Sequence, residues 1–167
     1  MIEPTILSVT VDDDLVRRAL SAAPQIIDEE LVPAVFEAQM LLEREVRDLT
    51  PTSGAGTLRD SIGALPITFT ESAMIAEVGT SLSYAQPVEE GSKPHRPPVE
   101  PIAEWVQRKL GKRPDEAKGI AWAISTKIAK VGSVGRFMFR DGLAATQAQI
   151  LEIIGGSVAA AVRRIGG

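Results

Sequence analysis

Apolar residues recur at every third or fourth position through the first third of the chain, the spacing of one helix face. The intervening positions are largely charged, as Glu37, Glu43 and Arg44 show. The pattern predicts one long amphipathic helix that kinks at Pro33 or begins near it, because proline interrupts helical hydrogen bonding. The apolar stripe comprises Ile27, Leu31, Val35, Ala38, Leu42, Val46 and Leu49.

Short segments flank this helix on both sides. Residues 1–11 are partly apolar and predict a strand or an ordered arm, and Asp12 to Asp14 would cap a short helix that Pro24 interrupts. After the long helix, the Pro-, Ser- and Gly-rich run 50–57 predicts a loop.

Two strand-like runs follow, at residues 62–70 and 73–80. The second alternates in polarity, and the short polar connection at Glu71 and Ser72 predicts a hairpin. Pro66 cannot donate a ladder hydrogen bond, so we expect the first strand to be weak or at an edge.

The second half of the chain returns to helical patterns. A helical turn is expected at 84–91, and an extended surface segment at 92–98, whose three prolines disfavour regular structure. Helices are predicted at 101–110, ended by Gly111, and from Asp115 to Val131, followed by a flexible connection at 132–136.

The C-terminal region predicts one further helix, or a strand leading into one, over 137–154. We expect Gly155 and Gly156 to separate a last Ala-rich helical piece from it. The order of elements predicts an α+β fold in which a small antiparallel sheet packs against the long N-terminal helix and the C-terminal helices. The length of 167 residues fits a single domain, with an arm at 1–11, a core at 12–154 and a helical tail at 155–167.

Composition removes several classes of chemistry. The chain has no cysteine and one histidine, so disulfides, zinc–thiolate sites and multi-histidine metal sites are excluded within one chain. Its apolar stretches look too short to span a membrane, and its acidic N-terminus argues against a signal peptide. We therefore expect a cytosolic protein with no cofactor and no membrane partner.

The net charge of −4 combines two unlike halves. Residues 1–84 contain five basic and fourteen acidic side chains, whereas residues 85–167 contain thirteen basic and eight acidic ones. Two interpretations account for this division equally well. In the first, both halves are ordinary solvated surfaces. In the second, the chain self-associates head to tail, so that an acidic face of one copy meets a basic face of the next.

Candidate catalytic groups are few. His95 lies between Pro94 and Arg96 without a nearby carboxylate, and Glu89 with Glu90 is expected to form a solvated helix face. No nucleophile-elbow, metalloprotease, phosphate-loop or dinucleotide motif is present. The sequence therefore predicts a non-enzymatic protein, with a carboxylate-pair hydrolase as a remote alternative.

A nucleic-acid-binding module is the main alternative function. The two helices at 101–110 and 115–130 could form a helix-turn-helix whose basic side chains contact phosphates. However, Asp115 and Glu116 would open the recognition helix and repel the DNA backbone. The basic residues in question are Arg108, Lys109, Lys112, Arg113 and Lys118.

Several short motifs follow one another in an order that resembles a known family. Over roughly residues 35–154, the chain is similar to the minor tail or head–tail joining proteins (neck and tail-completion proteins) of long-tailed bacteriophages and prophages. The segment 101–131 resembles a helical insertion found in some members. The motifs are Thr57–Ile62, Val78–Thr80, Tyr84–Ala85, Glu90–His95 and Gly132–Met138, before an amphipathic C-terminal helix.

The resemblance implies a virion structural protein, present in the host cytoplasm during assembly. Such proteins form homo-oligomeric rings at the head–tail junction, contact other neck and tail proteins, and let DNA pass without sequence-specific contact. We expect ring formation to depend on assembly, so that the isolated chain can be monomeric. A position as a tail terminator is equally compatible. The segment 81–98 is a candidate docking loop, and a solvated loop is its alternative. The candidate assembly-interface residues are Tyr84, Glu90, Lys93, His95, Arg96, Arg136 and Phe137.

Overall fold

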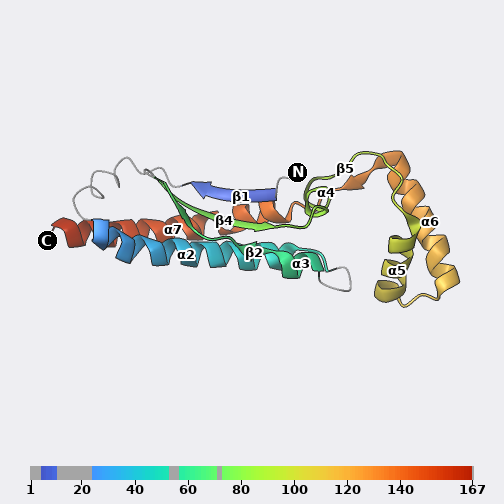
Figure 1. The fold of residues 1–167 in the computed structure, drawn as a ribbon, viewed down its shortest axis with the longest axis horizontal. Helices are drawn as coiled ribbons and strands as arrows, with labels where there is room; N and C mark the ends of the chain where they lie inside the picture. Colours follow the sequence, from blue (N-terminus) through green and yellow to red (C-terminus); the bar gives the residue numbers. More distant parts are fainter. Residues whose placement is uncertain (1–4, 11–23, 53–56, 71–72, 167) are drawn as a thin grey trace.

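The structure, a computed structural model, describes residues 5–10, 24–52, 57–70 and 73–166. The short helix expected after Asp12 and the turn at Glu71–Ser72 lie outside these residues. Two long helices run side by side along an elongated body, and a small sheet lies along them (Figure 1). A pair of shorter helices extends from one end of this body (Figure 1).

The first long helix, α2, spans Pro24–Leu49 and confirms the predicted amphipathic helix. It neither begins nor ends at Pro33, which is exposed and lies within the helix. Its inward face supplies much of the core between the sheet and the second long helix. The buried apolar residues of this face are Ile27, Leu31, Ala34, Val35, Ala38, Leu41, Leu42 and Val46.

The second long helix, α7, spans Met138–Gly166 without interruption and packs along α2. The expected break at Gly155 and Gly156 is therefore wrong. Both glycines are exposed, and each costs only about 1 kcal/mol relative to alanine in a helix. Packing on both sides of them, by Ile154 and Ala161, offsets this cost because both side chains are buried among α2 residues.

The sheet is organised around β4 (Met74–Thr80), which pairs with every other strand of the sheet. Strand β1 (Thr5–Thr10) lies on one side, and β2 (Gly63–Ala64) and β3 (Thr68–Phe69) lie on the other. All three pairings are antiparallel. Together with the long helices, this small antiparallel sheet confirms the predicted α+β fold.

The first predicted strand, 62–70, is divided into β2 and β3 around Pro66. A short helix, α3 (Thr57–Ser61), precedes it. A side chain from α2 supports the break: Nε2 of buried Gln39 donates to the carbonyl oxygens of Leu65 (2.7 Å) and Glu77 (2.8 Å). The helix thus satisfies backbone acceptors at the place where the proline limits the ladder.

The remaining elements confirm the helices predicted in the second half. Helix α4 spans Ala85–Glu90, α5 spans Val99–Leu110 and α6 spans Pro114–Val131. Gly111 ends α5 in the left-handed conformation, as a glycine after a helix commonly does. The predicted flexible connection at 132–136 instead contains a strand, β6 (Ser133–Val134), which pairs with β5 (Gly91–Ser92).

The length of α7 corrects one expectation about membranes. By length and composition, its residues 138–165 could cross a membrane. No unbroken apolar run revealed this, because polar residues such as Gln147 and Glu152 interrupt the pattern. Core helices that are mostly buried pass the same test, whereas 22% of the most apolar stretch of α7 is buried, and α7 packs along α2.

The glycines of α7 give a matched test of its packing. We expect Gly155→Ala to raise the free energy of unfolding by about 0.5–1 kcal/mol, since nothing lies within 4 Å of the added methyl group. Gly142→Ala would place the added Cβ 2.8 Å from Cγ2 of Val46, so overpacking should cancel or reverse the gain in the free energy of unfolding. Urea unfolding of the two variants measures the difference, and equal gains would contradict the close helix contact.

A second prediction concerns the C-terminal end of α7, where Arg164 pairs with Glu29 (2.8 Å) and Glu30 (2.7 Å) of α2. The hydrogen bond and charge of Arg164 lower the pKa of Glu29 below 4.5. The pair therefore stabilises the fold above the unfolded-state pKa, and this contribution is lost as pH falls through the lower folded-state value. Arg164→Gln should raise the pKa of Glu29 in an NMR titration; an unchanged pKa would exclude the pair in solution.

Candidate functional site

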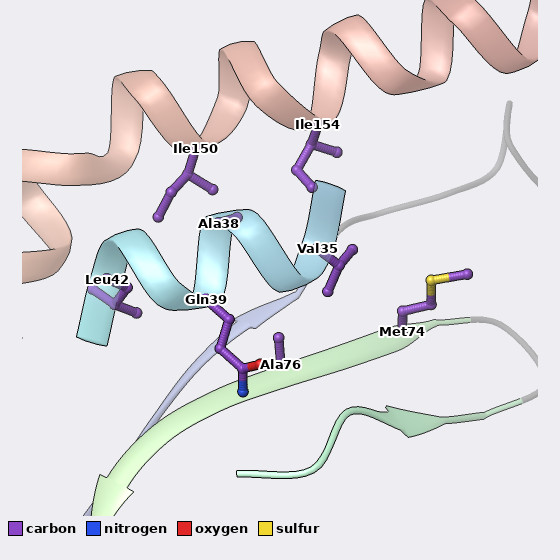
Figure 2. Close-up of a pocket in the computed structure, with 8 residues that line it drawn as sticks. All are labelled: Val35, Ala38, Gln39, Leu42, Met74, Ala76, Ile150 and Ile154. Atoms are coloured by element: carbon purple, nitrogen blue, oxygen red, sulfur yellow. The ribbon is translucent and has the colours of Figure 1, made fainter. Parts of the chain in front are cut away.

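The helix pair and sheet line a small apolar cavity. Figure 2 shows Val35, Ala38 and Leu42 of α2 facing Ile150 and Ile154 of α7, with β4 on the remaining side. Its volume of about 20 Å³ holds one water molecule and no larger ligand. The other lining residues are Gln39, Met74 and Ala76. The cavity is therefore a packing feature of the core.

A more informative site lies where the body meets the α5–α6 pair. Strands β5 and β6 form a two-stranded antiparallel ribbon, in which Gly91 pairs with Val134 and Ser92 with Ser133. The two serine hydroxyl oxygens lie 2.8 Å apart. This ribbon carries the chain out to the α5–α6 pair and back (Figure 1). We call α5, α6 and their connection the helical hairpin.

Close backbone contact across the ribbon requires glycine. Gly91 and Gly132 both have positive φ, of 86° and 76°. A Cβ on Gly91 would overlap the Ser133 carbonyl oxygen, and one on Gly132 would overlap that of Ser92. Side chains at these positions would therefore separate the strands as well as strain the backbone.

Glu89 joins the same region to the start of α7. Its carboxylate accepts hydrogen bonds from the backbone N–H groups of Phe139 (3.0 Å) and Arg140 (3.1 Å) in the first turn of that helix. The expectation of a solvated Glu89 is wrong, because the side chain is only 7% exposed. A carboxylate at a helix N-terminus satisfies free N–H donors and complements the helix dipole, which accounts for its burial.

Four of the candidate interface residues lie around this junction. Tyr84 and Glu90 are exposed at the two ends of α4, and Arg136 is exposed just before α7. The Arg136 N–H donates to the carbonyl oxygen of Val88 (2.8 Å), which holds the two segments together. Phe137 has a φ of 52° and is half-buried, with the Arg140 guanidinium 3.8 Å from its ring centroid.

The other three candidates lie on the segment between the ribbon and α5. Lys93, His95 and Arg96 are all exposed, as expected for this segment. Nδ1 of His95 lies 3.0 Å from the Lys93 carbonyl oxygen, which can only accept, so this bond requires a proton on Nδ1. The Arg96 guanidinium lies 5.6 Å from the ring centroid of Trp122 on α6, within range of a cation–π interaction.

Two residues of the region were not among the candidates. Glu89 has no sequence signature as a cap, because it lies 50 residues from the N–H groups it binds. Trp122 lies on α6 and is 56% exposed. An exposed tryptophan beside lysines is a signal that could have been used. So are the two Gly-Ser pairs that flank the hairpin, at 91–92 and 132–133.

Exposed charged and aromatic side chains surround this site. Among the described residues, no group of three or more His, Asp or Glu side chains is placed to hold a metal ion. The two helices of the alternative helix-turn-helix hypothesis are present as α5 and α6, which pack on each other. Two basic residues of the helical hairpin, Lys112 and Arg113, form ion pairs with Glu116 at 3.7 Å and 3.4 Å.

Residues 14–91 match a family of phage tail components. The family is described as "Bacteriophage HK97-gp10, putative tail-component". No curated protein and no solved structure matches the chain. The resemblance to phage tail proteins, predicted over roughly residues 35–154, is confirmed for the part of that range that the match covers, up to residue 91.

The boundary of the tail-component match coincides with a structural boundary. The matched segment includes α2, β2, β3, β4 and α4, and it ends at Gly91, the first residue of the ribbon. The helical hairpin and α7 therefore lie outside it. Of these two, α7 completes the core of the matched segment, whereas the hairpin does not pack extensively on it.

The cap of α7 gives a testable prediction. Glu89→Ala should lower the free energy of unfolding by about 1–3 kcal/mol, because it leaves a buried N–H group of Phe139 and a part-buried one of Arg140 without an acceptor. Glu90→Ala is the matched control: this neighbour is exposed, and we expect a change within about 0.5 kcal/mol. Denaturant unfolding measures both, and equal effects would contradict the capping role.

Proposed function

We propose that this protein is a non-enzymatic structural component of a phage neck or tail, which assembles as a ring at the head–tail junction or tail end. The observation that carries the proposal is the tail-component match over residues 14–91. The proposed partners are further copies of the chain and other neck and tail proteins. DNA passes through the ring with only non-specific contact.

The distribution of charge supports this assembly. The helix α2 contains seven acidic and two basic residues, whereas residues 93–136 contain ten basic and four acidic ones. A ring requires a heterologous contact, in which two different surfaces of neighbouring copies meet. Opposite charges on two separate parts of one molecule favour such a contact over a self-complementary one.

We also propose residues 101–131 as an insertion within a single domain, and residues 81–98 as a docking loop. The insertion proposal is supported by the position of the hairpin outside the tail-component match and beyond the end of the body (Figure 1). The loop proposal is supported by the exposure of Lys93, His95 and Arg96.

Two measurements test the proposed ring. Native mass spectrometry and negative-stain electron microscopy at low salt should show discrete closed oligomers. DNA affinity should be weak, independent of sequence and strongly reduced by salt, as expected for contacts to phosphates alone. A monomer or dimer with nanomolar, sequence-dependent binding would instead support a nucleic-acid-binding module.

Charge reversal tests the docking loop. The double variant Lys93→Glu with Arg96→Glu should weaken assembly while leaving the melting temperature nearly unchanged, because both side chains are exposed. Lys109→Glu with Lys112→Glu changes the net charge equally at the far end of the hairpin and serves as the control. Unaltered oligomers in the first variant would contradict the docking role.

A further inference from the structure

The outer face of α6 has an open hollow with mixed apolar and basic walls. It is lined by Trp122, Ala123, Thr126, Lys127, Lys130 and Val131. Trp122 and Val131 are 56% and 68% exposed. Large exposed apolar side chains grouped in a depression, and tryptophan above all, are typical of interaction surfaces.

The lysines of this hollow are available for a partner. Lys127 and Lys130 are exposed, and neither forms an ion pair with any residue that the structure describes. The basic residues at the hairpin tip differ, since Lys112 and Arg113 are paired with Glu116. The free positive charges of α6 therefore flank its exposed apolar side chains.

A complementary surface exists on the same molecule, on the outer side of α2. Phe36 is 54% exposed there, next to exposed Glu37 and one helical turn after exposed Pro33. Glu37 has no ion-pair partner among the described residues. This face thus combines an exposed aromatic side chain with free negative charge.

The two surfaces do not meet within one molecule. The hairpin extends beyond the end of the body, and α5 and α6 pack on each other without extensive contact with α2 (Figure 1). Complementary surfaces that are held apart in one copy can meet only between copies, through a heterologous contact.

We propose that the hollow on α6 of one copy receives the outer face of α2 of a second copy. Phe36 enters the hollow against Trp122 and Val131, and Glu37 lies opposite Lys127 and Lys130. The inference rests on the proposed function only in that this contact joins copies in the ring.

Cysteine cross-linking tests the contact directly, because the chain contains no cysteine of its own. Ala123→Cys lies in the hollow and Pro33→Cys lies on α2, and neither replaces a proposed contact residue. A mixture of the two variants, treated with a short bis-maleimide, should give dimers that contain one copy of each. Either variant alone should remain uncross-linked, and so should Ala123→Cys mixed with Gln149→Cys, an exposed position of α7.

Charge exchange is the second test of the α6–α2 contact. Lys127→Glu with Lys130→Glu should weaken self-association in sedimentation by about tenfold or more, which corresponds to about 1.4 kcal/mol. Adding Glu37→Lys to that variant should restore part of the loss. The control, Lys109→Glu with Lys112→Glu, should have a much smaller effect, and circular dichroism should show an unchanged helix content in all variants.

The outcomes separate this inference from the proposed function. Rings without the mixed cross-link would overturn the α6–α2 contact and leave the ring intact. A wild-type chain that stays monomeric up to about 1 mM, a concentration matching roughly −4 kcal/mol of association free energy, would overturn the α6–α2 contact. A monomer that also binds DNA with nanomolar, sequence-dependent affinity would overturn the proposed function as well. Loss of DNA binding with unchanged self-association in the Lys127 and Lys130 variant would assign these lysines to DNA instead.

Discussion

The fold depends on covering α2 on two sides at once. The sheet strands other than β1 and β4 are two residues long, so the sheet has little apolar surface with which to stabilise itself. Packed on α2, it shares one core with α7, in which Val46, Val78 and Met138 are fully buried. Helix α2 even contributes polar support to the sheet, through Gln39 and through Glu43, which accepts a hydrogen bond from the Ala64 N–H.

Sequence patterns predicted the elements whose stabilising residues lie close together in the chain. The helices α2, α5 and α6 each carry apolar stripes at helical spacing, and glycine marks the end of α5. The continuity of α7 through Gly155 and Gly156 was not predictable in this way. It depends on residues of α2 more than a hundred positions away, which hold both halves of α7 in one line.

The candidate site was predicted only in part, because some of its contacts join residues that are far apart in the chain. Exposure of the segment around His95 follows from its prolines, and the structure agrees. The ribbon, by contrast, joins residues about forty positions apart, and the Glu89 cap joins residues fifty apart. Glu89 and Glu90 illustrate this limit of sequence-based prediction, because the two neighbours look alike in sequence. Glu89 is buried against a distant helix terminus, whereas Glu90 is exposed.

The two-stranded ribbon also determines how the hairpin responds to mechanical load. Both strands connect the same two parts of the molecule, so tension on the hairpin is shared by two covalent chains acting in parallel. Stretching it does not require the hydrogen bonds between β5 and β6 to break. On the body side, the load reaches α4 and the start of α7 together, where backbone hydrogen bonds from Arg136 and Phe137 join the two. The hairpin is thus attached to the body by two covalent connections that carry tension in parallel.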